Sequence, residues 1–198
     1  TNRKKMLSLE ESLKILKESK ALIEGHFILS SGLHSPKYIQ CAQLMSKPSH
    51  ALKICESLAN KIKDKLDEFD LILSPAMGGI IVGYELGKLL NKQTIFSERV
   101  SGEFKLRRDF KINKGSKVLI VEDVITTGKS SIECSKLVTL NEAIIVGYAC
   151  IIDRSNNKSL IRGKIISQVQ LNIPTYKKDD LPKELISINP VKPGSRNL

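Results

Sequence analysis

Two adjacent acids, Glu122 and Asp123, stand between an apolar run and a stretch of small and hydroxylated residues in KVLIVEDVITTGKSS, residues 117–131. The apolar run, 118–121, is short, rich in β-branched side chains and free of polar alternation, which predicts a strand buried on both faces. We expect the two acids at the carboxyl end of this strand, where open α/β sheets bind ligands. The residues that follow turn into a helix, whose N-terminus and converging backbone N–H groups attract an anion.

The letters GKS at 128–130 imitate the end of a Walker A loop, but the complete pattern needs a glycine where this chain has Asp123. A P-loop nucleotidase is therefore disfavoured, because carboxylates at the mouth of a phosphate site would repel a polyphosphate. Carboxylates instead accept hydrogen bonds from a sugar diol, so an acid pair beside one phosphate favours a ribose phosphate. The structural alternative is a plain strand-to-helix turn with an N-capping threonine.

VLIVEDVITTGKS resembles the phosphoribosyl-pyrophosphate (PRPP) motif of type I phosphoribosyltransferases, in which four apolar residues precede two acids and a Thr/Gly phosphate loop. Three other segments resemble the orotate-using branch of that family: GHFILSSGLHSPKYI at 25–39, IIDRS at 151–155 and VKPGSR at 191–196. The resemblance implies transfer of the 5-phosphoribosyl group from PRPP to orotate, giving orotidine 5′-monophosphate and pyrophosphate in UMP biosynthesis. It leaves open another acceptor base, or a non-catalytic regulator that binds PRPP or RNA.

The resemblance also implies roles for individual residues. Asp123 and Lys105 are the implied catalytic residues. PRPP binding is assigned to Arg99, Glu122, Asp123, Val124, Ile125, Thr126, Thr127, Gly128, Lys129 and Ser130. A pyrophosphate loop is assigned to Ala76, Met77, Gly78 and Gly79, and orotate binding to Thr126 and Arg154. Where many members have lysines, this chain has Ser30 and Gly78.

Residues 101–115, SGEFKLRRDFKINKG, form a basic segment between two predicted strands. From composition alone it is a charged, exposed hairpin, whereas the family places here a mobile loop that closes on pyrophosphate, usually in the neighbouring subunit. The family's loop histidine is absent, so Lys105, Arg107 and Arg108 are the candidates. We also expect no acid cluster of its own to neutralise these cations, and a homodimer with shared sites.

Alternating strand and helix signals predict an α/β fold with a parallel sheet flanked by helices and a small N-terminal hood. We expect one domain over 1–198, with the hood mainly from 1–45 plus the C-terminal segment and the core at about 46–173. Helices are predicted over 8–19, 48–66, 80–91 and 132–140. Strands are predicted over 69–74, 93–100, 143–152 and 165–173, with a hairpin at 27–31 and 36–40.

Composition limits the class of protein. The net charge of +11 favours polyanionic partners, but only 5% of residues are aromatic and none is Trp, so the composition disfavours nucleic-acid binding through stacked bases. Four scattered cysteines, without metal-ligand spacing, predict small buried side chains in a reducing compartment. With no apolar run of membrane length and no signal core, we expect a cytoplasmic protein. Any Mg²⁺ is expected to arrive with PRPP, without a direct protein site.

Overall fold

The computed structural model describes residues 5–194. In chain order the elements are α1 (Leu9–Glu18), β1 (Leu22–Ile28), β2 (His34–Ile39), α2 (Cys41–Met45), α3 (Pro48–Lys65), β3 (Leu71–Pro75), α4 (Gly79–Leu90), β4 (Gln93–Val100), β5 (Glu103–Leu106), β6 (Lys117–Ile125), α5 (Lys129–Leu140), β7 (Ile144–Asp153), β8 (Ile165–Gln170) and α6 (Lys183–Ile186).

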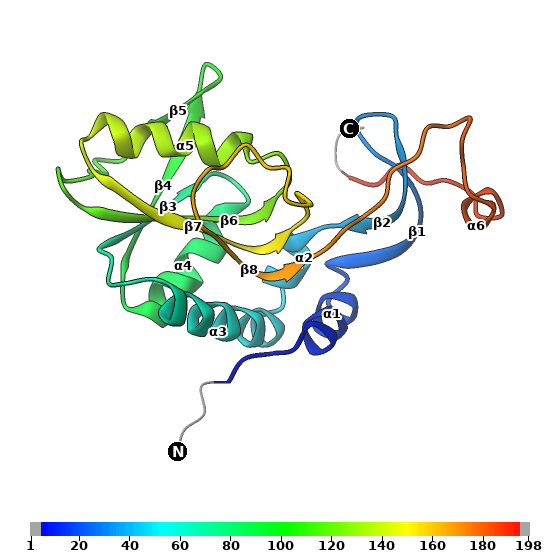
Figure 1. The fold of residues 1–198 in the computed structure, drawn as a ribbon, viewed down its shortest axis with the longest axis horizontal. Coiled ribbons are helices and arrows are strands. Elements are labelled where there is room, and N and C mark those ends of the chain that lie inside the picture. Colours follow the sequence, from blue (N-terminus) through cyan, green and yellow to red (C-terminus); the bar gives the residue numbers. More distant parts are fainter. Residues whose placement is uncertain (1–4, 195–198) are drawn as a thin grey trace.

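Six strands form a sheet in the order β5-β4-β3-β6-β7-β8, parallel except for the pair β4–β5. Helices α3 and α4 cover one face and α5 covers the other (Figure 1). Along β6, Leu119 and Val121 enter the core on the first face, while Val118 and Ile120 enter the core on the second. The predicted α/β class and the strand buried on both faces are therefore confirmed.

Local sequence signals explain several element boundaries. Pro48 opens α3, where its missing N–H costs no intrahelical hydrogen bond. Ser8 caps α1: its hydroxyl accepts from the Glu11 N–H at 3.1 Å, and the Glu11 carboxylate accepts from the Ser8 N–H at 2.8 Å. These two hydrogen bonds form a capping box at the start of a predicted helix, and β4 also forms over its predicted range.

The central strand is longer than its apolar run. We expected the acids to follow the strand, but β6 continues to Ile125, because its parallel pairing with β7 extends to Ile125 opposite Asp153. Glu122 and Asp123 are thus strand residues. Their side-chain directions follow from the pleat of the strand, which a loop would not impose.

The hairpin β1–β2 forms a separate two-stranded sheet, which the C-terminal segment completes. The Ile28 N–H donates to the Val191 carbonyl at 2.8 Å, and His34 forms a bridge with Tyr176. Figure 1 shows this hairpin and the tail side by side, apart from the large sheet. Ser195 and Arg196, the end of the predicted VKPGSR motif, lie outside the described residues.

Two buried histidines fasten the hairpin to the tail. Nδ1 of His26 lies 2.8 Å from the carbonyl oxygen of Ile188, and its Nε2 lies 2.6 Å from Nδ1 of His34. A carbonyl oxygen only accepts, so Nδ1–H of His26 is the donor. In a neutral His26, Nε2 then accepts from Nδ1–H of His34.

The helices within the predicted hood range pack elsewhere. Leu16 of α1 and Leu44 of α2 are fully buried in the core that α3 and α4 share with the sheet. The Gln168 side chain of β8 donates to the Ser12 hydroxyl of α1 at 2.9 Å. Within residues 5–45, the part that stands away from this core is the far end of the hairpin, since Leu22 and Ile39 at its base still pack in the core.

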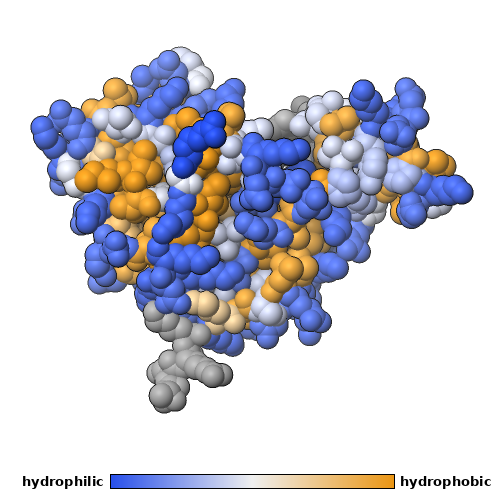
Figure 2. Space-filling view, in the orientation of Figure 1, coloured by the Kyte–Doolittle hydropathy of each residue, from blue (hydrophilic) through white to orange (hydrophobic). Residues whose placement is uncertain are grey.

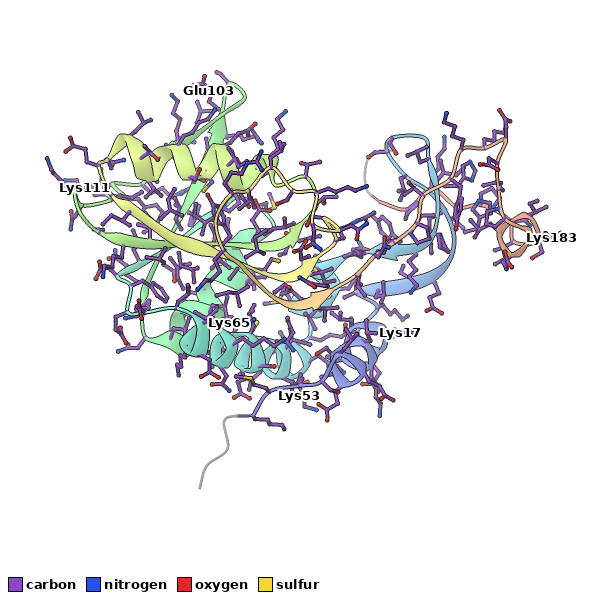
Figure 3. All side chains as sticks on the ribbon, viewed as in Figure 1. Lys17, Lys53, Lys65, Glu103, Lys111 and Lys183 are labelled. Carbon is purple, nitrogen blue, oxygen red and sulfur yellow. The ribbon has the colours of Figure 1, made fainter. Side chains whose placement is uncertain are left out.

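The surface and the cysteines agree with the composition. Figure 2 shows a mostly hydrophilic face with apolar patches, and the labelled lysines of Figure 3 lie at the periphery of the molecule. All four cysteines are free and buried, as predicted, and burial raises the pKa of each thiol, for Cys55 and Cys134 to about 12. Among helices in the described part of the chain, none has the length and apolarity to cross a bilayer.

Candidate active site

Two strand-to-helix turns meet at the carboxyl edge of the sheet, because β3 and β6 are parallel neighbours. A cavity of about 170 Å³ lies between them. It is lined by Pro75, Ala76, Gly78, Gly79, Arg99, Phe104, Glu122, Asp123 and Ser130. Seven of these nine were predicted site residues. The cavity is smaller than the roughly 300–1,000 Å³ of a complete ligand site, so it suits one polar group of a larger ligand.

Other hollows are larger but lack this convergence of chemistry. One of them, about 530 Å³, lies along α1 and is lined by the helix residues Leu9, Glu10, Leu13, Lys14, Lys17 and Glu18. A ligand site combines a concave shape with a few convergent polar groups from different elements. The smaller cavity between the two turns meets that condition, because its acids and its arginine come from different strands.

The two acids point to opposite faces of β6, as successive strand residues do. Glu122 faces α5, where its Oε1 accepts from the Ser131 hydroxyl at 3.0 Å. Burial raises the pKa of Glu122 to about 7, the negative charge of Asp123 adds to this rise, and the Ser131 hydrogen bond and Arg99 oppose it. Asp123 faces the turn before α4, and burial raises the pKa of its carboxyl as well.

Asp123 leaves no room for a side chain at position 78. A Cβ built on Gly78 would lie 2.7 Å from Oδ2 of Asp123. The other oxygen, Oδ1, accepts from the Val124 N–H at 2.8 Å, which fixes the carboxylate. The glycine found here in place of the family's lysine thus lets the turn approach the acid closely.

The predicted pyrophosphate loop is held against the neighbouring strands. The Ala76 N–H donates to the Ser97 carbonyl at 2.8 Å, and a Cβ on Gly79 would lie 2.9 Å from the Val121 carbonyl oxygen. The Ala76–Met77 peptide bond is cis. Met77 is 85% exposed and does not line the cavity, unlike the three other residues of this loop.

The predicted phosphate loop has the expected left-handed turn. Gly128 has φ 83° and precedes α5 as its N-cap. The Lys129 N–H donates to the Thr127 hydroxyl at 3.2 Å. Thr126 and Thr127 are exposed, whereas Ile125 is buried, so this loop presents its hydroxyls at the surface beside the cavity.

The basic segment forms a hairpin, in agreement with its composition. Strand β5 pairs antiparallel with β4, which places Lys105 opposite Glu98. Lys105 lies in a groove between β5 and α5, outside the cavity, and its Nζ is 3.2 Å from Glu103. Figure 3 shows Glu103 on this projecting hairpin.

The expectation that these cations lack acidic partners is wrong for two of them. Besides the pair of Lys105 with Glu103, Arg108 donates to both oxygens of Glu98, at 2.9 and 3.1 Å. Glu103 stands two residues before Lys105 on β5, but Glu98 lies on the partner strand β4, so a count along residues 101–115 does not find the pair of Arg108. Arg107 is exposed.

Arg154 follows β7 at the same edge of the sheet. Its N–H donates to the Ile125 carbonyl at 2.9 Å, so its backbone is fixed beside the end of β6. The guanidinium is half-buried, burial lowers its pKa, and no side-chain or carbonyl partner for it is found within residues 5–194. A partly desolvated cation in this state suits an anionic ligand.

Sequence reasoning missed four residues at the site: Pro75, which lines the cavity, and Ser131, Phe104 and Glu133. Ser131 binds Glu122, Phe104 lines the cavity, and Glu133 pairs with Arg99 at 2.7 Å. Helical spacing gives a signal for Glu133, since it stands four residues after Lys129 on α5. Phe104 and Ser131 have no such local signal, because their contacts cross between elements.

Comparison with known proteins agrees with this geometry. Residues 42–178 match the family model described as the phosphoribosyl transferase domain. An orotate phosphoribosyltransferase of Parvibaculum lavamentivorans is 45% identical over 96% of this chain and 98% of its own length. One from Methylorubrum extorquens is 46% identical over 96% of this chain and 97% of its own.

Solved structures share the fold. The crystal structure of orotate phosphoribosyltransferase from Aeropyrum pernix aligns with a TM-score of 0.68 and 24% identity, covering 80% of this chain and 92% of that one. At that identity the similarity shows a shared fold only. Membership of the family follows from the family model and from the sequence relatives. The chain belongs to the phosphoribosyltransferase family, in the branch of the orotate phosphoribosyltransferases.

Proposed function

We propose that this protein transfers the 5-phosphoribosyl group of PRPP to orotate, giving orotidine 5′-monophosphate and pyrophosphate in UMP biosynthesis. The observation that carries the proposal is the cavity in which Glu122, Asp123 and Arg99 meet the glycines of the β3–α4 turn. It combines carboxylates for a sugar with a cation and close backbone approach for an anion. The names of the relatives supply the acceptor base.

PRPP would bind across both turns. The loop Thr126–Ser130 would hold the 5-phosphate with its hydroxyls, its backbone N–H groups and the start of α5. Ala76, Gly78, Gly79 and Arg99 would surround the pyrophosphate, and Arg99 supplies the positive charge there. The measured cavity is the size of this polar group, so the ribose and its phosphate would extend over the open edge.

The carboxylates would act on the ribose between these two anions. As pyrophosphate leaves, the anomeric carbon gains positive charge and the departing oxygens gain negative charge. Asp123, fixed by the Val124 N–H, would stabilise the developing cation. Glu122 would bind the ribose from the side of the sheet that α5 covers. Stabilising charge that develops in the transition state is the main source of rate here, since orotate is acidic at its reacting ring and needs little help from a base.

Orotate would lie against Arg154 and Thr126. The Arg154 guanidinium is half-buried without a partner in the described residues, and its planar fork matches a carboxylate. The hairpin β1–β2, with its C-terminal strand partner, would form the hood over the base. Ser30 in the hairpin cannot supply the charge of the family's lysine, so Arg154 would carry more of the recognition.

The donor set suits Mg²⁺ brought by PRPP. The described residues contain no group of three His, Cys, Asp or Glu side chains placed to hold a metal. Two carboxylates at the cavity fit a hard ion that keeps most of its ligands from phosphates and water. When bound, Mg²⁺ would neutralise pyrophosphate charge. Asp123 and Glu122, which line the cavity, would accept hydrogen bonds from the water molecules around the ion.

We propose a homodimer in which Lys105 acts on the neighbour's pyrophosphate. Lys105 lies in the groove beside α5, outside its own chain's cavity, while Arg99 of the preceding strand lines that cavity. Arg107 and Arg108 on the same hairpin are further candidates, although Arg108 must leave Glu98 to act. The cytoplasm is the expected location for this reaction.

The test measures pyrophosphate release from PRPP and Mg²⁺ with orotate, uracil, hypoxanthine or adenine as acceptor. We expect turnover with orotate and little with the other bases. Asp123→Asn is the matched control, because it keeps the shape but removes charge near the developing cation, so turnover should fall more than PRPP affinity. Preference for another base would reject orotate. PRPP binding without turnover with any base would indicate a regulator.

A further inference from the structure

Arg99 is held from three sides before any ligand is present. Its Nη2 lies 2.7 Å from Oε2 of Glu133, and its Nη1 donates to the Gly102 carbonyl at 2.9 Å. Its guanidinium carbon stands 4.2 Å from the centroid of the Phe104 ring, within cation–π distance. An exposed arginine would otherwise sample many rotamers, so this arrangement fixes a long side chain at the wall of the cavity.

Glu133 is the charged member of this clamp. Its Oε2 is buried and accepts no well-aligned hydrogen bond among the described residues, so the contact with Arg99 is an ion pair that compensates its charge. The other oxygen, Oε1, lies 3.9 Å from Nζ of Lys129, one turn earlier on α5. Glu133, a residue of the helix that begins at the phosphate loop, therefore lies between Arg99 and Lys129.

The clamp leaves Arg99 able to bind an anion. A guanidinium has five N–H donors in a fixed fork, and the contacts with Glu133 and Gly102 engage its Nη2 and Nη1 atoms. Arg99 lines the cavity together with the glycines of the β3–α4 turn, whereas Glu133 does not. The carboxylate thus holds the arginine from outside the cavity.

We propose that Glu133 is a positioning residue that aligns Arg99 for pyrophosphate and links it to the phosphate loop through α5. This inference rests on the proposed function, in which Arg99 binds pyrophosphate. Glu133 touches no substrate and acts by holding Arg99 in advance, which lowers the ordering cost when the ligand binds. Its own charge would weaken the arginine's pull on the anion, but the loss of orientation is the larger effect.

The role predicts a coupling between two residues. Glu133→Ala should weaken the affinity for inorganic pyrophosphate with Mg²⁺, measured by calorimetry, by about tenfold, within the range of couplings between contacting residues. The Michaelis constant for PRPP should rise while kcat changes less. Glu133→Gln keeps the shape and an acceptor oxygen, so it should recover part of the affinity. In an Arg99→Ala background, Glu133→Ala should change the affinity by less than about twofold.

The control is Glu68→Ala, which removes an acid paired with Lys92 at 2.8 Å away from the cavity and should leave pyrophosphate affinity unchanged. Thermal unfolding confirms that each variant is folded, and the milder Glu133→Gln serves if Glu133→Ala is not. The inference is overturned if folded Glu133 variants bind pyrophosphate as tightly as the parent, or if their loss persists without Arg99. Pyrophosphate binding needs no acceptor base, so the coupling can hold even where orotate turnover fails.

Discussion

Ile161 packs directly on Gly128: a Cβ built on the glycine would lie 2.9 Å from Cγ1 of the isoleucine. A second contact joins the same segments, since the Leu160 N–H donates to the Thr127 carbonyl at 2.8 Å. The phosphate loop is therefore held by the connection between β7 and β8. The first atom of a side chain added at position 128 would therefore meet Ile161.

Gly128→Val should reduce PRPP affinity by at least about tenfold, because it combines a clash with Ile161 and a side chain at φ 83°, each worth about 1–3 kcal/mol. Calorimetry with PRPP measures the change. Gly115→Val is the matched control, since Gly115 has φ 77° and nothing within 4 Å of an added Cβ. Near-normal PRPP affinity in folded Gly128→Val would refute the assignment of this loop.

Glu122 should make the protein less stable as pH rises. Its pKa is raised to about 7 by burial, above the ordinary value of 4.5. Between these pH values the unfolded carboxyl ionises while the folded one keeps its proton, so the free energy of unfolding falls by up to about 3 kcal/mol. Glu122→Gln should remove this part of the pH dependence, measured by urea unfolding at pH 5 and 7.5. An unchanged pH dependence in the variant would contradict the prediction. The pKa of Asp123 is also raised by burial, so Asp123 contributes to the pH dependence of stability in both proteins.

Arg154→Ala should weaken orotate binding by about 1.5–3 kcal/mol, the worth of a hydrogen bond to a charged group. Its guanidinium has no partner to lose among residues 5–194, so protein stability should change little. Orotate affinity is measured by calorimetry, with PRPP affinity as the internal control. Unchanged affinity for orotate would remove Arg154 from the site.

Lys105→Ala should lower turnover by about tenfold or more and change PRPP affinity less, if its contact forms mainly in the transition state. To test whether it acts in the neighbouring subunit, Lys105→Ala chains, with their reduced turnover, are mixed with Asp123→Ala chains, and the activity is compared with that of each variant alone. Some mixed dimers then contain one intact site, and activity should return. No recovery, with subunit exchange verified by mass, would place Lys105 in its own chain's site or outside catalysis.

The apolar pattern of the sequence was enough to predict the strand β6 and the helix α3, because local signals determine both. It did not predict how far β6 extends, since the two acids at 122 and 123 interrupt the apolar run, and pairing with β7 continues the strand to Ile125. The contacts of Arg99 and Arg108 were also out of reach, because Glu133 and Glu98 meet them only after β4, β5 and α5 assemble.

The union of the N-terminal hairpin with the C-terminal segment sets an order of events during synthesis. An isolated two-stranded hairpin is marginally stable in water. The hairpin β1–β2 gains two further backbone bridges from the C-terminal segment, one between Phe27 and Val191 and one between His34 and Tyr176. The strands of the large sheet end at Gln170, so they leave the ribosome before those partners do. The proposed phosphate sites can therefore assemble on the nascent chain before the proposed hood, whose additional partners are translated later.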